Sequence, residues 1–212
     1  MAADTVVLAT RNAAKLRELA RILGAEDSAS RDGGEQIRLA GLDEFPGAPD
    51  VPETGATFEE NALLKARAIA DYTGLPAVAD DSGLCVDALN GMPGVLSARW
   101  AGRAKDDHAN NLLLLDQLTD VPDGRRAARF QCVVALCHPN GEERVAPGIM
   151  PGRVIRELRG SGGFGYDVLF VPDEQEGELT SAEMTPEAKD LISHRGHSLR
   201  AIAPAVVELL GS

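Results

Sequence analysis

Residues 75–83 read Leu-Pro-Ala-Val-Ala-Asp-Asp-Ser-Gly, a short apolar run that leads directly into two adjacent carboxylates. We interpret the run from Leu75 to Ala79 as a strand that ends at Asp80 and Asp81, with Ser82-Gly83 forming a tight turn. Open α/β folds keep their chemistry outside the strand ends, so this stretch predicts a site at the rim of a sheet. Carboxylates this close repel each other unless a divalent metal, a proton or a neighbouring Lys or Arg offsets their charge.

The length and composition of the chain are typical of a globular protein. Its 212 residues, 44% of them hydrophobic, predict a single domain, residues 1–212, with two lobes. The net charge of −12 argues against binding to long nucleic acid, which needs a basic surface. A small phosphorylated ligand needs only a local basic pocket, and the composition leaves that class open.

The sequence also indicates where the protein works. No apolar run approaches the roughly 20 residues that cross a bilayer, and the stretch from Val6 to Thr10 is too short for a signal sequence. Cys85, Cys132 and Cys137 lack metal-ligand spacing and lie in apolar or alternating stretches, so we expect them to be reduced and buried. We therefore predict a cytoplasmic protein that does not bind membranes.

Helical and strand patterns interleave along the chain. Alternating or continuous apolar runs predict strands at Thr5–Ala9, Gln36–Leu39, Leu75–Ala79, Arg129–His138, Glu143–Ile149 and Val168–Val171. Helical spacing of apolar residues predicts helices at Asn12–Leu23, Asp106–Leu118 and Ser198–Leu210. A capping box at Thr57–Glu60 predicts a helix that runs to about Tyr72, and Pro186 suits the first position of a short helix. Asp32-Gly33-Gly34 lies in an acidic, loop-rich region. The turn at Pro139-Asn140-Gly141 joins antiparallel strands, so the predicted class is α/β with a mixed sheet.

The first candidate site is Thr10-Arg11-Asn12-Ala13-Ala14-Lys15, between the first strand and the first helix. Backbone amides at a helix N-terminus favour anions, and two basic side chains add formal charge. These residues are therefore candidates for a phosphate cradle, although the Walker pattern is absent. The alternative is that Asn12 is an ordinary helix cap beside two solvated basic residues.

The second candidate site is Asp80-Asp81-Ser82. Mg²⁺ prefers oxygen ligands and is usually held by one or two carboxylates plus substrate phosphates, and a nearby carboxylate can deprotonate a water. The alternative is a strand-end turn in which Asp80 caps the following loop. Glu53 precedes the second helix and is a candidate metal ligand, while Lys65 on that helix is a candidate phosphate contact. Solvated side chains are the alternative for both.

Two further clusters lie towards the C-terminus. In Gly162-Gly163-Phe164-Gly165-Tyr166-Asp167, glycines on both sides of Phe164 leave its ring open to stack on a nucleobase, unless it folds back into the core. Lys189 and Ser193-His194-Arg195-Gly196 offer hydrogen-bond donors suited to carbonyl or phosphate oxygens. A hydrolase triad of Ser82, His194 and Asp81 is disfavoured, because the nucleophile-elbow pattern is absent.

Six motifs occur in an order that resembles the inosine/xanthosine triphosphate pyrophosphatase family, the house-cleaning purine nucleotide hydrolases. They are Thr-Arg-Asn-Ala-Ala-Lys, Thr-Phe-Glu-Glu-Asn-Ala-Leu-Leu-Lys-Ala, Ala-Asp-Asp-Ser-Gly-Leu, Gly-Met-Pro-Gly-Val-Leu-Ser-Ala-Arg, Gly-Gly-Phe-Gly-Tyr-Asp and Ser-His-Arg-Gly. The resemblance runs from about Val6 to Leu210. It implies an elongated mixed sheet flanked by helices, two lobes with the active site in the cleft between them, a Mg²⁺ cofactor and a homodimer. Val168 and Ala188 depart from the usual pattern, which puts only local loop geometry in doubt.

The resemblance also implies a role for each candidate residue. Asp81 becomes the general base and a Mg²⁺ ligand, with Glu53 as a second ligand. The substrate-binding residues become Thr10, Arg11, Asn12, Ala13, Ala14, Lys15, Ser82, Phe164, Gly165, Tyr166, Asp167, Lys189, His194 and Arg195.

The implied reaction is hydrolysis of ITP, dITP or XTP at the α-phosphorus to the nucleoside monophosphate and pyrophosphate. Donors from His194, Arg195 or the nearby backbone would recognise the 6-oxo group of the base, which adenine lacks. Two alternatives stay open at this point. One is a pyrophosphatase for pyrimidine or other modified nucleotides, and the other is a nucleotide-binding regulator without catalysis.

Overall fold

The computed structural model describes residues 5–30 and 37–210, and it confirms the expected α/β class with a mixed sheet. Within those residues, six strands form one sheet in the order β2-β1-β3-β4-β5-β6. The strands are β1 (Thr5–Leu8), β2 (Arg38–Gly41), β3 (Ala77–Val86), β4 (Ala127–Cys137), β5 (Glu143–Val154) and β6 (Phe170–Pro172). β1 runs parallel to β2 and β3, whereas β5 runs antiparallel to β6.

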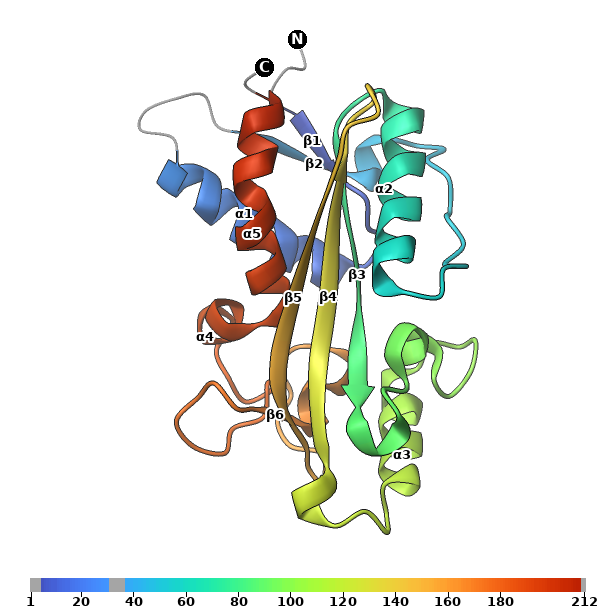
Figure 1. The fold of residues 1–212 in the computed structure, drawn as a ribbon, viewed down its shortest axis with the longest axis vertical. Helices are drawn as coiled ribbons and strands as arrows, with labels where there is room; N and C mark the ends of the chain where they lie inside the picture. Colours follow the sequence, from blue (N-terminus) through green and yellow to red (C-terminus); the bar gives the residue numbers. More distant parts are fainter. Residues whose placement is uncertain (1–4, 31–36, 211–212) are drawn as a thin grey trace. The chain divides into compact units, whose positions relative to one another are not determined.

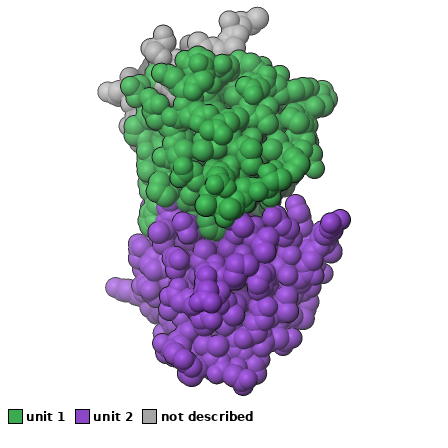
Figure 2. All heavy atoms as spheres, turned by 45° about the vertical axis from the view of Figure 1, so that its right-hand side comes forward, with its two compact units in different colours: residues 1–81, 132–147, 195–212 green, residues 82–131, 148–194 purple. Residues whose placement is uncertain are grey.

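The helices flank this sheet (Figure 1). They are α1 (Ala13–Ser30), α2 (Phe58–Thr73), α3 (Asp107–Gln117), α4 (Pro186–Ile192) and α5 (His194–Leu210). Short 3-10 helices are η1 (Leu42–Glu44), η2 (Asp87–Leu89), η3 (Gly94–Arg99), η4 (Asp123–Arg125) and η5 (Gly165–Leu169). The chain forms two compact units, coloured separately in Figure 2. Unit 1 comprises residues 1–81, 132–147 and 195–212, and unit 2 comprises residues 82–131 and 148–194.

Unit 1 carries helices on both sides of its strands: α1 and α5 lie on one side and α2 on the other (Figure 1). Buried apolar side chains of α1 and α5 pack with those of the strands, including Val6, Leu8, Leu19, Ile22, Val78, Leu199, Ile202 and Val206. On α2 the expected cap is present, because the Thr57 side chain accepts the amide of Glu60. The Glu60 carboxylate accepts the amide of Ala56 rather than that of Thr57. The helix ends at Gly74, whose left-handed φ of 67° suits glycine.

Unit 2 is built around a second apolar cluster, which includes Leu84, Leu114, Phe130, Met150, Leu169 and Phe170. Asp106 caps the N-terminus of α3 by accepting the amide of Ala109. The buried Arg126 guanidinium donates to the backbone carbonyls of Leu118, Val154 and Ile155. Because buried donors must be satisfied, this arginine joins the end of α3 to the end of β5.

The prediction that β3 ends at the paired aspartates is wrong. β3 continues through Asp80 and Asp81 to Val86, so the carboxylates lie inside a ten-residue strand. Gly83 makes no turn there. A Cβ atom at residue 83 would lie 2.4 Å from both the Gly94 carbonyl oxygen and the Ser97 Oγ, so the glycine allows a close approach to η3.

Other element boundaries also differ from those predicted. The strand expected at Val168–Val171 begins only at Phe170, because the preceding residues form η5. The last helix begins at His194 instead of Ser198 and continues through Pro204. The predicted strand at Gln36–Leu39 is displaced to Arg38–Gly41. Gln36 and the Asp32-Gly33-Gly34 segment lie outside the described residues.

Candidate active site

The segment between β1 and α1 is organised by the side chain of Asn12. Its Oδ1 accepts the amides of Ala14 at 2.9 Å and Lys15 at 3.2 Å, which are first-turn donors of α1. Thr10 Oγ1 accepts the amide of Asn12, and Arg11 donates to the carbonyl of Ala48. Asn12 is therefore a helix cap, as the alternative interpretation held, but Lys15 is not the solvated side chain of that alternative, because its ammonium is paired with Asp80. A phosphate at residues 10–15 would compete with Asn12 for those two amides, and that role stays a proposal.

Asp80 is surrounded by cations within unit 1. Its Oδ2 accepts from Lys15 Nζ at 2.9 Å and from Arg195 Nε and a terminal nitrogen at 3.2 Å. Arg195 also donates to Glu18 at 2.5 Å. Asp80 and Arg195 are 3% and 1% exposed, so this is a buried network of two carboxylates and two cations.

The electrostatic consequence for Asp80 is large. Burial pushes the pKa of this carboxyl upward, but the charges of Lys15, Arg195 and Lys65 outweigh burial and hold the pKa far below its usual range. For Arg195, burial lowers the guanidinium pKa while Glu18 and Asp80 raise it, and the net pKa is raised. Asp80 therefore remains ionised and acts as an anchor for two basic side chains.

Asp81 has a different environment. Its Oδ1 accepts from Lys65 Nζ at 3.0 Å, and its Oδ2 accepts from Asn61 Nδ2 at 3.2 Å. Lys65 Nζ also donates to Glu53 Oε1 at 2.9 Å. Burial raises the pKa of Asp81, Lys65 and Lys15 oppose the shift, and Glu53 adds to it, so the pKa lies above its ordinary value. A carboxylate with a raised pKa holds a proton more strongly, which suits a general base.

Lys65 is the cation between the two predicted metal ligands. Burial lowers its pKa, but Asp81, Asp80 and Glu53 raise it by more, so the ammonium form is favoured. The alternative of a solvated side chain is therefore wrong for Lys65. In these contacts, oxygens of Asp81 and Glu53 converge on a single ammonium nitrogen. Such a pair of hard oxygen donors fits Mg²⁺, which takes one or two carboxylates and completes its shell with waters and phosphates.

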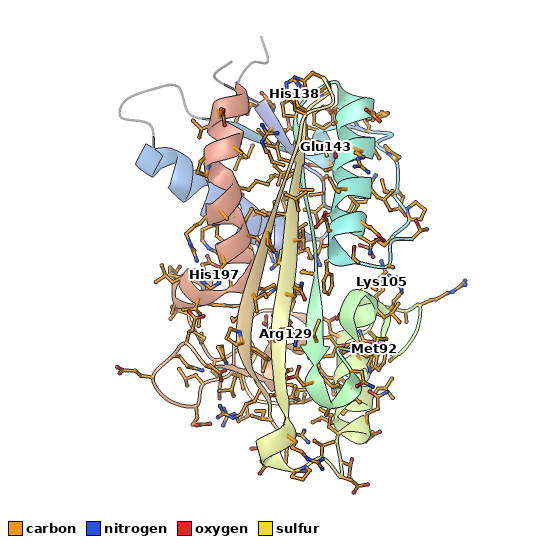
Figure 3. All side chains as sticks on the ribbon, in the orientation of Figure 1. Met92, Lys105, Arg129, His138, Glu143 and His197 are labelled. Carbon is orange, nitrogen blue, oxygen red and sulfur yellow. The ribbon has the colours of Figure 1, made fainter. Side chains whose placement is uncertain are left out.

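Histidine and cysteine side chains also bind metal ions in proteins. Among the described residues, no group of three or more His, Cys, Asp and Glu side chains is placed to hold a metal ion. His138 and Glu143 lie near the turn that joins β4 to β5 (Figure 3), and His138 Nδ1 accepts the amide of Asn140. The oxygens of Asp81 and Glu53 are hard donors, which suit Mg²⁺, Ca²⁺ or Mn²⁺ better than softer metals.

The second group of predicted residues meets in unit 2, around Asp167. Its Oδ2 accepts the amide of Phe164 at 2.9 Å and Lys189 Nζ at 2.7 Å. Lys189 Nζ also lies 5.5 Å from the centre of the Phe164 ring, within cation–π range. Phe164 is only half-buried, so its ring is not folded into the core.

Other predicted residues of unit 2 are placed differently. Tyr166 is 4% exposed, and its hydroxyl donates to the Ser97 carbonyl at 2.9 Å, so the ring is part of the core instead of a frame for a ligand. The buried His194 ring stacks on Phe130, with centroids 4.9 Å apart. Ser82 lies within β3 and is partly buried.

Comparison with known proteins identifies the family. A family model described as the Ham1 family matches residues 6–205. The chain belongs to the Ham1 family. A dITP/XTP pyrophosphatase from Nocardia farcinica is 59% identical over 204 residues, which cover 96% of this chain and 95% of that protein. The structure of a HAM1 protein from Coxiella burnetii covers 98% of this chain and all of its own length, with 40% identity and a TM-score of 0.82. A nucleoside-triphosphatase / dITP/XTP pyrophosphatase from Mycobacterium abscessus is 51% identical over 95% of this chain and 98% of its own, with a TM-score of 0.73.

For this Ham1 family chain, the resemblance drawn from six motifs is confirmed. The motifs contain Asp81 and Lys15, and Glu53 was a candidate from its loop position, but Glu18 lies outside all six motifs and Asn61, inside the second motif, was assigned no role. Helical spacing offered a signal for both, because Lys15 and Glu18 are three residues apart on α1 and Asn61 and Lys65 are four apart on α2. Side chains at these spacings share a helix face.

Proposed function

We propose that this chain hydrolyses nonstandard purine nucleoside triphosphates, ITP, dITP and XTP, to the nucleoside monophosphate and pyrophosphate. The observation that carries the proposal is the Asp81–Lys65–Glu53 arrangement, in which two carboxylates meet one cation beside the buried Asp80 network. It occurs in a Ham1 family chain whose similar relatives are named dITP/XTP pyrophosphatases.

Asp81 is proposed as the general base that orients and deprotonates the attacking water. Two features support this role: the raised pKa of the carboxyl and the hydrogen bond from Asn61, which fixes the orientation of the carboxylate. A base must be within hydrogen-bond reach of the proton that it removes, and Asn61 and Lys65 hold Asp81 in one position. The Asp80 network then holds the adjacent backbone in place.

Mg²⁺ is proposed as the cofactor, with Asp81 and Glu53 as its protein ligands. When bound, the ion would supply positive charge to the phosphate oxygens and to the leaving pyrophosphate. Lys65 and Lys15 carry the remaining positive charge of unit 1 near these carboxylates, and we assign their ammonium groups to the phosphate chain. With Thr10, Arg11, Asn12, Ala13 and Ala14, they form the proposed phosphate-binding group.

Base recognition is assigned to unit 2. The half-buried Phe164 ring is proposed to stack on the base, with Lys189 and the backbone of Gly165 beside it. His194 is proposed as a further base contact, and its buried ring stacks on Phe130. Arg195 receives a different role from the one expected at the outset. Because its guanidinium is bound to Asp80 and Glu18 and is 1% exposed, we propose that it holds Asp80 instead of donating to the base.

A substrate panel tests the proposal directly. ITP, dITP, XTP, ATP, GTP and pyrimidine triphosphates are incubated with the chain, with and without Mg²⁺, and pyrophosphate is scored against orthophosphate. We expect pyrophosphate release from the first three, dependent on the metal. Comparable turnover of ATP would contradict recognition of the 6-oxo group, and preference for a pyrimidine would reassign the substrate. Nucleotide binding without release of pyrophosphate would support the alternative of a nucleotide-binding regulator without catalysis.

We also propose that the protein acts in the cytoplasm as a homodimer. Cys85, Cys132 and Cys137 are free and buried, as expected for a reducing compartment. No helix among the described residues has the length and apolar character needed to span a membrane. Light scattering of the purified chain measures the oligomeric state.

A further inference from the structure

Helix α3 holds both backbone groups of Gly165. Asp107 Oδ2 accepts the Gly165 amide at 2.7 Å, and Asn111 Nδ2 donates to the Gly165 carbonyl at 2.9 Å. Asp107 and Asn111 are four residues apart, so they present their side chains from one face of the helix. A single glycine is thereby fixed at its donor and at its acceptor by two side chains.

This glycine directly follows Phe164, and its φ of 61° lies in the left-handed region. On the other side of the aromatic residue, Asp167 accepts the Phe164 amide. The backbone is therefore bound both at Phe164 and immediately after it. Because the backbone sets the direction of the Cα–Cβ bond, these contacts fix the position from which the Phe164 ring extends.

The buried side chain of Asn111 is unfavourable unless the bonds of its Nδ2 group offset the cost. The residue is 3% exposed, and its Oδ1 is among the buried described atoms that have no hydrogen-bond partner. Burying an amide oxygen without a partner is unfavourable, and an apolar side chain of similar size would avoid this. The Nδ2 group of Asn111 offsets this cost by donating to the carbonyls of Gly165 and Asp107.

The neighbouring Asn110 is a natural comparison. It is also buried, at 2% exposed, but its amide binds the Ala101 amide and the Ala98 carbonyl. Two adjacent asparagines on α3 thus hold two different segments of unit 2, and only Asn111 holds the segment with Phe164.

We propose that Asn111 and Asp107 are positioning residues that orient the Phe164 ring for stacking on the purine base. This inference rests on the proposed function, in which Phe164 contacts the base. Neither residue belongs to the proposed phosphate-binding group or contacts Asp81 in the bonds described above, so we expect their loss to weaken base binding and to leave the chemical step intact.

Steady-state kinetics with dITP and calorimetric binding of dIMP test the proposal in the full chain. We expect Asn111→Ala and Asp107→Ala to raise KM and the dIMP dissociation constant about tenfold, equivalent to about 1.4 kcal/mol, with kcat changed less than about twofold. Asp107→Asn keeps an oxygen acceptor for the Gly165 amide and should stay near wild type. Asn110→Ala, which removes a buried amide from the same helix, should leave KM unchanged.

Hydrogen exchange at the Gly165 amide gives a readout that does not depend on turnover. Protection should fall in Asp107→Ala and persist in Asp107→Asn. Wild-type KM and protection in Asp107→Ala would overturn the positioning role, and this exposed position decides the matter even if Asn111→Ala fails to fold. A wild-type chain that neither hydrolyses dITP nor binds dIMP would instead overturn the proposed function, and this inference with it.

Discussion

Replacing Arg195 by methionine tests the buried charge network of unit 1. Methionine is similar in length and apolar, so it fills much of the space while removing every guanidinium donor. Asp80 and Glu18 then lose the cation that both share. Removing one partner of a buried ion pair is strongly destabilising, by about 3–5 kcal/mol, because a charge remains buried without compensation.

The size of the effect can be stated as a melting temperature. For a chain of this length, about 1 kcal/mol corresponds to roughly 2–4 °C, so Arg195→Met should melt about 6–20 °C below wild type. The matched control is Arg67→Met. Arg67 is likewise paired with a glutamate, through two bonds of 2.6 and 2.7 Å to Glu143, but half of its side chain is exposed. An exposed pair contributes about 0–1 kcal/mol, so the control should shift by no more than about 4 °C.

Circular dichroism melts at neutral pH, with the metal removed by chelation, measure both variants. Asp80 keeps Lys15 in this variant, whereas Glu18 loses its cation. Adding Glu18→Gln to Arg195→Met removes that buried charge and should restore part of the lost stability. If Arg195→Met melts within the range of Arg67→Met, the account of Arg195 as the anchor of Asp80 is refuted.

Three further outcomes follow from the same geometry. Asp81→Asn should keep the fold and reduce kcat for dITP by about 10²–10⁴-fold, the usual contribution of a general base; near-normal turnover would remove Asp81 from that role. Lys65→Met leaves Asp81 and Glu53 without their shared ammonium, so Mg²⁺ alone should raise the melting temperature of this variant more than that of wild type; an equal rise would show that Lys65 does not compete with the metal. Burial, with a smaller effect of Asp107, raises the pKa of the Tyr166 phenol above its unfolded value of about 10. The neutral phenol therefore contributes to the free energy of unfolding fully below pH 10, and this contribution is lost as the pH rises further. Urea midpoints should fall less steeply between pH 10 and 12 in Tyr166→Phe than in wild type.

Local patterns predicted most of the elements. The capping residue Thr57 and the first-position Pro186 marked helix starts that the structure confirms. Alternation predicted the β4–β5 hairpin, since side chains in strands alternate between faces. These signals act within a few residues of chain, so a single sequence displays them fully.

The length of β3 could not be predicted in the same way. Adjacent carboxylates ordinarily indicate a strand end, and they remain within the strand here because Lys15, Lys65 and Arg195 offset their charge. Those partners come from three distant parts of the sequence. Gly83 poses a similar difficulty, because a glycine required by the close approach of another backbone has the same letter as one required by a turn.

The sequence predicted which residues belong to the candidate site better than it predicted the partners that each of them contacts. Motifs located Asp81 and Arg195, but nothing local distinguishes an arginine that contacts a ligand from one that binds two buried carboxylates. That distinction depends on Glu18, which lies 177 residues away in the sequence.

The basic side chains paired with Asp80 and Asp81 affect whether the protein needs a metal ion in order to fold. Since Lys15, Arg195 and Lys65 already balance these carboxylates, the polypeptide does not need a divalent ion to reach its native state. Under the proposed Mg²⁺ dependence, chelator treatment should give an inactive chain that stays folded and regains activity when Mg²⁺ is added, without a refolding step.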